Sequence, residues 1–347
     1  MTNNIKRINH NISGNCFCSS FSNLLQFHGY KYDESVIYGL SCCIYLGFVG
    51  MVNKHIYNIV VNYPNMLPSL VSNTGLKYRT INSKNPADEL KCIMDLFNSN
   101  HIIVLQLHPS LCVPNRNETA GFVSYAPAHW ITVVGCDMNN EIFYYYDNRS
   151  FNLKEIPFDK FFEGRDKGIE DTNPRRTLYL FDFCNELYSL ETSIKLSLNS
   201  TINLNLYQNR VLSMYSSASG LNKFLRVIDA WTKFLSSEQI QENLLRMKIS
   251  ITGGYSVKGG YRMLFVRYLN FLSFYFNDNR LIDISNIYRE SASLWDELLV
   301  LIDDVLLAKK ALNKELLNAF KHIISCIFIF EQKGFSKLNE WNVFCNL

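Results

Sequence analysis

One cysteine near the start of the chain stands where a helix is predicted to begin. Residues 14–29 read Gly-Asn-Cys-Phe-Cys-Ser-Ser-Phe-Ser-Asn-Leu-Leu-Gln-Phe-His-Gly, in which apolar residues recur at helical spacing and Gly29 closes the run. The positive end of a helix dipole favours a thiolate, so we expect Cys16 at this helix start to be reactive. A nucleophilic thiol needs a base, so the fold must bring a basic side chain from another part of the chain to Cys16.

A histidine and an aspartate in the middle of the chain have the positions that a base and its orienting acid need. His129 precedes a predicted strand over 130–136, and Asp147 ends a predicted strand over 141–146. The turn over 137–140 joins the two strands as a hairpin, which brings Asp147 close to His129. We expect Asp147 to accept the proton on Nδ1 of His129 and to stabilise the imidazolium.

Neighbouring residues leave two alternatives open. Cys18 also lies at the start of the helix, although from one turn further in we expect it to face the core. Asn148 takes the place of Asp147 if the strand register slips by one residue. The helix start and the hairpin geometry favour Cys16 and Asp147.

Composition limits the classes of protein to which the chain can belong. It has 347 residues, of which 48% are hydrophobic, enough for a substantial core and for two domains. The formal net charge is +3 without a cluster of lysine and arginine, so we expect no nucleic-acid partner. We find neither the apolar stretch of a signal peptide nor an apolar run that could span a bilayer. We therefore expect a cytoplasmic protein with no membrane partner.

The ten cysteines are scattered along the chain, and many lie in apolar segments. In a reducing cytosol such residues behave as small buried hydrophobes. The Cys-x-Cys step at 16–18 and the adjacent pair at 42–43 do not have the spacing of a zinc site. We expect no metal.

The two halves of the chain differ in pattern. Residues 1–185 show helices followed by strand segments, including 102–107 and 177–183, which is typical of an α+β domain. Residues 186–347 show helical spacing without clear strands, and we predict an all-helical (all-α) domain. The helices predicted there include residues 221–235, 261–275, 284–307 and 314–330.

Four segments, taken in order, bring one enzyme family into view. The first is the helix over 14–29, and the second is an acid followed by Tyr-Gly-Leu within 33–40. The third, over 129–137, fits His-x-x-x-Val-x-Gly-x-Asp, and the fourth, over 252–269, has glycines followed by an arginine and aromatic residues. Together they resemble the acyltransferases of the butirosin-biosynthesis protein H type. The chain departs from that pattern at Asn15, where the family has a histidine.

The resemblance implies a papain-like cysteine-protease fold over 1–185, an N-terminal helix plus an antiparallel sheet, followed by a helical domain over 186–347. It also implies amide-forming acyl transfer in the biosynthesis of a secondary metabolite such as an antibiotic. The acyl group would pass from the phosphopantetheine thioester of an acyl or peptidyl carrier protein, through an acyl-cysteine intermediate, to a small amine. No cofactor is implied beyond the carrier's own phosphopantetheine.

Further residues are candidates for roles beside Cys16, His129 and Asp147. His10, six residues before Cys16, has the offset at which papain-like enzymes place an oxyanion donor, and Asn15 lies nearby. Arg262 and Tyr261 are candidates for substrate binding, and Arg262 and Arg267 are candidates for contact with an acidic helix of the carrier protein or with the phosphopantetheine phosphate.

Two other functions use the same residues or the same fold. A cysteine peptidase or amidase needs the same nucleophile, base and acid. A binding module without catalysis would keep the fold around an inert Cys16. The resemblance predicts a type of reaction, amide-forming acyl transfer. It does not predict the acyl group, the amine or the oligomeric state.

Overall fold

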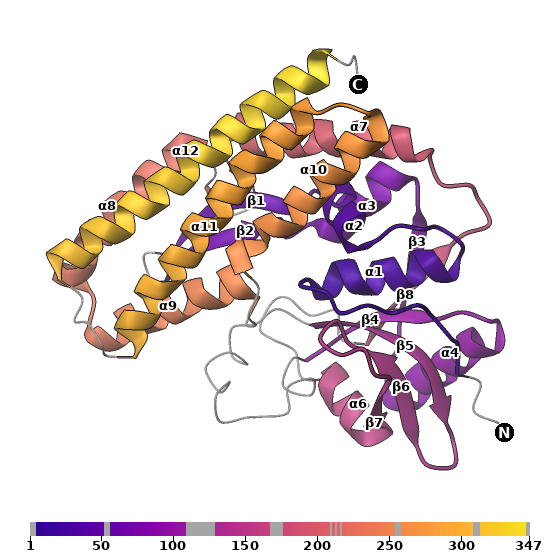
Figure 1. The fold of residues 1–347 in the computed structure, drawn as a ribbon. Helices are drawn as coiled ribbons and strands as arrows, with labels where there is room; N and C mark the ends of the chain where they lie inside the picture. The colour runs from indigo at the N-terminus through magenta and orange to yellow at the C-terminus, as the bar shows by residue number, and fades with distance from the viewer. Residues whose placement is uncertain are drawn as a thin grey trace. The chain divides into compact units, whose positions relative to one another are not determined.

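The computed structural model describes most of the chain and divides it into two compact units (Figure 1). Unit 1 combines Met1–Ile37 with Gly75–Leu187, and unit 2 combines Tyr38–Thr74 with Tyr188–Leu347. The described residues are 5–51, 56–108, 129–166, 176–208, 210–211, 214–215, 217–253, 258–307 and 313–344. The sequence predicted one change of domain at residue 185, whereas the structure also groups residues 38–74 with the second unit.

Helix α1 (Cys16–Phe27) opens the regular structure of unit 1, as the sequence predicted. Asn15 is its N-cap, because its Oδ1 accepts a hydrogen bond from the backbone N–H of Cys18 at 3.0 Å. At the other end Gly29 has φ +90°, a conformation that L-residues rarely adopt. The predicted glycine stop is therefore confirmed.

A four-stranded antiparallel sheet with strand order β4-β5-β6-β7 packs against α1. Its strands are β4 (Ile103–Leu107), β5 (His129–Asp137), β6 (Ile142–Tyr146) and β7 (Lys154–Pro157). The predicted hairpin is confirmed, with Thr132 of β5 opposite Tyr146 of β6. His129 begins β5 and Asp147 directly follows β6, so the antiparallel pairing brings both residues to the same end of the sheet.

Apolar side chains from two helices cover this sheet. Helix α4 (Pro86–Asn98) contributes Ile93 and Phe97, and helix α6 (Phe158–Asp166) contributes three buried phenylalanines to the same core. Phe17 of α1 instead packs on Trp130 of β5, with ring centroids 5.6 Å apart. Burial on both sides explains why the middle of β5 carries the apolar residues Trp130, Ile131, Val133 and Val134. A separate antiparallel pair consists of β3 (Lys77–Asn82) and β8 (Thr177–Asp182).

Unit 2 is mainly helical but not all-helical, which corrects the prediction. It contains an antiparallel sheet with strand order β2-β1-β10-β9. Its strands are β1 (Ile44–Met51), β2 (Ile56–Asn62), β9 (Arg210–Val211) and β10 (Met214–Tyr215). Phe48 of β1 pairs with Tyr215 of β10. This pairing between distant segments explains why residues 38–74 belong to unit 2.

The helices of unit 2 are long and largely as the sequence predicted. Helix α2 (Glu34–Leu40) starts in unit 1 and ends in unit 2. The others are α3 (Met66–Thr74), α7 (Leu190–Ile202), the π-helix η3 (Asn203–Tyr207), α8 (Ser217–Phe234), α9 (Ser237–Thr252), the 3₁₀ turn η4 (Lys258–Tyr261), α10 (Arg262–Phe276), α11 (Arg280–Leu306) and α12 (Lys314–Phe344). None of the helices in the described part of the chain has both the length and the apolar character needed to cross a membrane.

Candidate active site

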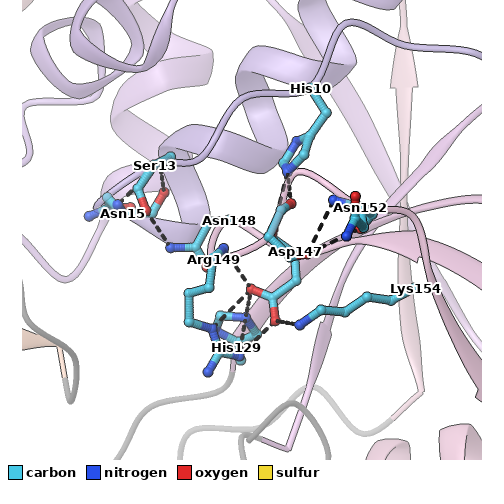
Figure 2. A network of polar contacts seen from close by, with 10 residues as sticks. His10, Ser13, Asn15, His129, Asp147, Asn148, Arg149, Asn152 and Lys154 are labelled. Atoms are coloured by element: carbon cyan, nitrogen blue, oxygen red, sulfur yellow. Dashed lines mark hydrogen bonds and ion pairs between the residues drawn. The ribbon is translucent and has the colours of Figure 1, made fainter.

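Hydrogen bonds from two directions fix the loop that leads into Cys16. Glu34 Oε1 accepts the backbone N–H of Asn15 at 2.7 Å and also the hydroxyl of Ser13. On the other side, the N–H of Ser13 donates to the carbonyl of Asn148 at 2.7 Å, and Asn148 Nδ2 donates to the carbonyl of Ser13 at 2.9 Å (Figure 2). The start of α1 is thereby tied to the loop that follows β6. Glu34 was not predicted to serve this site.

The thiol of Cys16 and the imidazole of His129 are in hydrogen-bonding contact. Burial alone would raise the pKa of Cys16, but the charge of His129, its hydrogen bond and the backbone N–H of Trp130 together lower that pKa below its usual value. Burial also disfavours the imidazolium, yet the thiolate and Asp147 raise the pKa of His129 to about 9. Both shifts favour a thiolate–imidazolium pair at neutral pH.

Asp147 contacts the far edge of the His129 ring, but not through the nitrogen that we predicted. His129 Nε2 lies 3.3 Å from Asp147 Oδ1 (Figure 2). This contact leaves Nδ1 as the nitrogen available to Cys16. The prediction of Nδ1 for Asp147 was wrong because the orientation of the ring depends on where α1 packs against β5. The roles of the two ring nitrogens are exchanged but both are kept, since one nitrogen faces the Cys16 sulfur and the Asp147 carboxylate orients the other.

Two cations that the sequence reasoning missed also bind the carboxylate of Asp147. Arg149 donates to it from Nε at 3.0 Å and from Nη2 at 2.7 Å, and Lys154 donates from Nζ at 3.1 Å. Burial would raise the pKa of Asp147, but His129 and Arg149 hold it well below its usual range. The sequence contained a signal for these contacts, because basic residues stand two and seven positions after Asp147. The turn into β7 folds both side chains back onto the carboxylate.

His10 does not have the position of an oxyanion donor, contrary to our prediction. Its Nε2 lies 3.1 Å from the carbonyl of Asp147 and 3.0 Å from the carbonyl of Ser150, and its Nδ1 lies 3.2 Å from Oδ1 of Asn23. Both ring nitrogens are therefore engaged. The offset from Cys16 was a poor guide, because it does not reveal that the turn after β6 passes beside this ring. His10 supports the turn that carries Asp147.

The remaining predicted neighbours of Cys16 are held in structural contacts. Asn15 uses its side-chain oxygen as the helix cap rather than turning it toward a substrate. Cys18 is fully buried, so the half-buried Cys16 is the thiol that meets His129. Asn148 pairs with Ser13, and Asp147 is the residue that reaches the imidazole. The structure thus brings together Cys16, His129 and Asp147 from the predicted alternatives.

Arg262 and Tyr261 belong to unit 2 and are buried, which corrects their prediction as substrate-binding residues. The guanidinium of Arg262 makes a two-pronged ion pair with Glu331, at 2.7 Å from both Nε and Nη2. Its other N–H groups donate to the carbonyls of Val61, Gly260 and Tyr45. All five donors are used, so Arg262 holds helices α10 and α12 to β1 and β2. The helical pattern did not reveal this, because Glu331 lies 69 residues away.

Comparison with known proteins leaves the family open. A scan against protein-family models finds no match, and a search of curated proteins finds no similar one. Among the described residues, no group of three or more histidine, cysteine, aspartate or glutamate side chains is arranged to hold a metal ion. The functional argument therefore depends on the geometry around Cys16.

Proposed function

We propose that Cys16 is a nucleophile that accepts an acyl group as a thioester and passes it to an amine, so that an amide is formed. The observation that carries the proposal is the imidazole of His129, which contacts the Cys16 thiol on one side and the Asp147 carboxylate on the other. An ionised thiol attacks acyl carbon readily, and a neighbouring imidazole can supply and remove the protons of both half-reactions.

The two half-reactions balance with these groups alone. The Cys16 thiolate attacks the carbonyl carbon of the donor thioester, and the departing thiolate takes the proton from His129. The amine then attacks the acyl-Cys16 thioester, gives one proton to the now neutral His129 and expels Cys16 as a thiolate. The products are an amide and a free thiol, and the thiolate–imidazolium pair is restored.

The first turn of α1 is suited to stabilise the oxyanion of both steps. The backbone N–H of Cys16 lies at the positive end of the helix, where no carbonyl of the helix itself can accept it. An oxyanion formed on a carbon bound to the Cys16 sulfur would lie close to this N–H. With His10 engaged elsewhere, we assign the backbone rather than His10 as the donor.

We further propose that the donor is a carrier-protein phosphopantetheine thioester and that unit 1 is a papain-like domain. The resemblance of the motifs around Cys16 and His129 supports the donor, and the mixed α+β unit with a helical C-terminal region is compatible with that family. A thioester is already activated, so amide formation needs no ATP. We place the reaction in the cytoplasm, because a catalytic thiol must stay reduced.

Intact-protein mass spectrometry tests the proposal. The protein is mixed with an acylated carrier protein, and we expect wild type to gain the mass of one acyl group, Cys16→Ala to gain none and an added amine to discharge the adduct. Cys184→Ser is the matched control, since Cys184 is an exposed thiol whose loss should leave the adduct in place. Absence of an adduct on wild type would reject acyl transfer. Turnover of peptides without a carrier protein would instead support a cysteine peptidase or amidase.

A further inference from the structure

Arg149 binds Asp147 more closely than His129 does. Its Nη2 lies 2.7 Å from Oδ2, its Nε lies 3.0 Å from Oδ1 and its backbone N–H donates to Oδ1 at 3.2 Å. The contact between Asp147 Oδ1 and Nε2 of His129, at 3.3 Å, is the longest of the set (Figure 2). The acid that orients the imidazole is therefore bound first of all to a guanidinium.

Lys154 and the position of the guanidinium add to this competition. Lys154 Nζ donates to Asp147 Oδ2 at 3.1 Å, so two permanent cations and one imidazole share a carboxylate that is fully buried. Arg149 Nη2 also lies 3.4 Å from His129 Nε2. A positive charge at that distance disfavours a second positive charge on the ring.

This arrangement matters most after Cys16 has been acylated. The thiolate, which favours the imidazolium in the free protein, is then an uncharged thioester sulfur. His129 must now be neutral to take a proton from the amine. An undivided Asp147 carboxylate would hold the ring in its protonated form, whereas a carboxylate shared with two cations holds it less strongly.

We propose that Arg149 is a positioning residue that divides the charge of Asp147 between itself and His129, so that the imidazole of the acyl-enzyme becomes neutral and accepts the proton of the amine. The inference rests on the proposed function. Among the residues that the structure describes, the charged or titratable groups that contact the pair include Cys16 on α1, Arg149 after β6, Lys154 on β7 and His10, whose ring binds the main-chain carbonyl of Asp147.

Removal of Arg149 has a definite expected sign. It removes a cation from beside Nε2, and it leaves more of the Asp147 charge to the ring, and both changes raise the pKa of His129. Asp147 itself should stay ionised at neutral pH, because Lys154 and the imidazolium still face it. A loss of orientation alone would act in the opposite direction, since an Asp147 that turned away would lower the pKa of His129.

The test is an NMR titration of isotope-labelled histidines in full-length protein that carries Cys16→Ser, whose uncharged hydroxyl stands for the acylated sulfur. The signal of His129 is identified by its loss on adding His129→Gln. Adding Arg149→Gln should raise the pKa of His129 by about one unit. Lys154→Gln, on a side chain that is 29% exposed, should produce a smaller rise. An unchanged or lowered pKa in the Arg149→Gln protein would overturn the proposal.

A matched control separates this effect from general damage. Arg176→Gln removes a two-pronged arginine–aspartate pair in the same unit, with Asp166, that shares no residue with the site. It should leave the titration of His129 unchanged, and a shift as large as that of Arg149→Gln would also overturn the proposal. The titration uses no acyl donor, so its outcome is independent of whether a carrier protein loads Cys16.

Discussion

Replacement of Asp147 by asparagine tests the electrostatic arrangement of the site. The carboxylate is fully buried and accepts hydrogen bonds from His129, Arg149 and Lys154. An amide has no negative charge and a single acceptor oxygen, so its NH₂ group would face one of these donors. The cations would then lie beside the sheet without a counter-charge.

The magnitude follows from how far the cations are buried. Removal of one partner of a fully buried ion pair costs about 3–5 kcal/mol. The side chains of Arg149 and Lys154 are 18% and 29% exposed, so water takes up part of the uncompensated charge, and we expect Asp147→Asn to lower the free energy of unfolding by about 2–3 kcal/mol. Adding Arg149→Met to the Asp147→Asn protein removes one uncompensated cation and should restore at least about 1 kcal/mol of the free energy of unfolding.

Urea denaturation at several pH values measures both quantities. The pKa of Asp147 is held below that of an unfolded aspartate, about 3.9, so its stabilisation is complete above that pH and is lost as the pH falls further. The difference between wild type and Asp147→Asn should thus be constant between about pH 5 and 6, below the range in which His129 titrates, and should shrink below about pH 4. Asp137→Asn is the control and should cost about 1 kcal/mol or less; Asp137 ends β5, and its carboxylate accepts backbone N–H groups of the β5–β6 turn. A cost below about 1 kcal/mol for Asp147→Asn, or a double variant less stable than the single one, would refute the reasoning.

Two further predictions concern the scaffold. Glu331→Gln leaves the guanidinium of Arg262 buried without a counter-charge, so urea denaturation should show a loss of about 3–5 kcal/mol, and a loss below about 1 kcal/mol would mean that this pair is not structural. Asn15→Ala removes the cap of α1 and should cost about 1 kcal/mol, measured in the same way. Asn15→Asp keeps an acceptor for the N–H of Cys18 and should stay close to wild type, and equal losses in the two variants would argue against capping.

The parts of the fold that the sequence predicted correctly are those set by local pattern. The extent of α1 follows from an apolar repeat that Gly29 closes, and the β5–β6 hairpin follows from two apolar strands around a short polar turn. Because the hairpin has a fixed geometry, the proximity of His129 and Asp147 followed from it. Helix α1 packs on β4 and β5, and this packing brings Cys16 to His129.

The features that the sequence did not predict depend on contacts between distant segments. Residues 38–74 join unit 2 because β1 pairs with β10, and such pairing has no local signature. Arg262 has the spacing of an exposed helical arginine, and its burial depends on Glu331 of another helix. The contact of Arg149 with Asp147 was hidden for a similar reason, since a turn that folds a side chain back onto the preceding acid is set by backbone geometry.

The most direct test of the account is the order in which the thiols of the native protein react. The protein is treated with iodoacetamide at about pH 6, where an ordinary thiol is scarcely ionised, and each alkylated cysteine is quantified by peptide mass spectrometry. The account predicts that half-buried Cys16 reacts before exposed Cys184, and that His129→Gln abolishes this lead. If Cys184 reacts first in the wild-type protein, Cys16 is not the ionised nucleophile that the geometry around His129 implies.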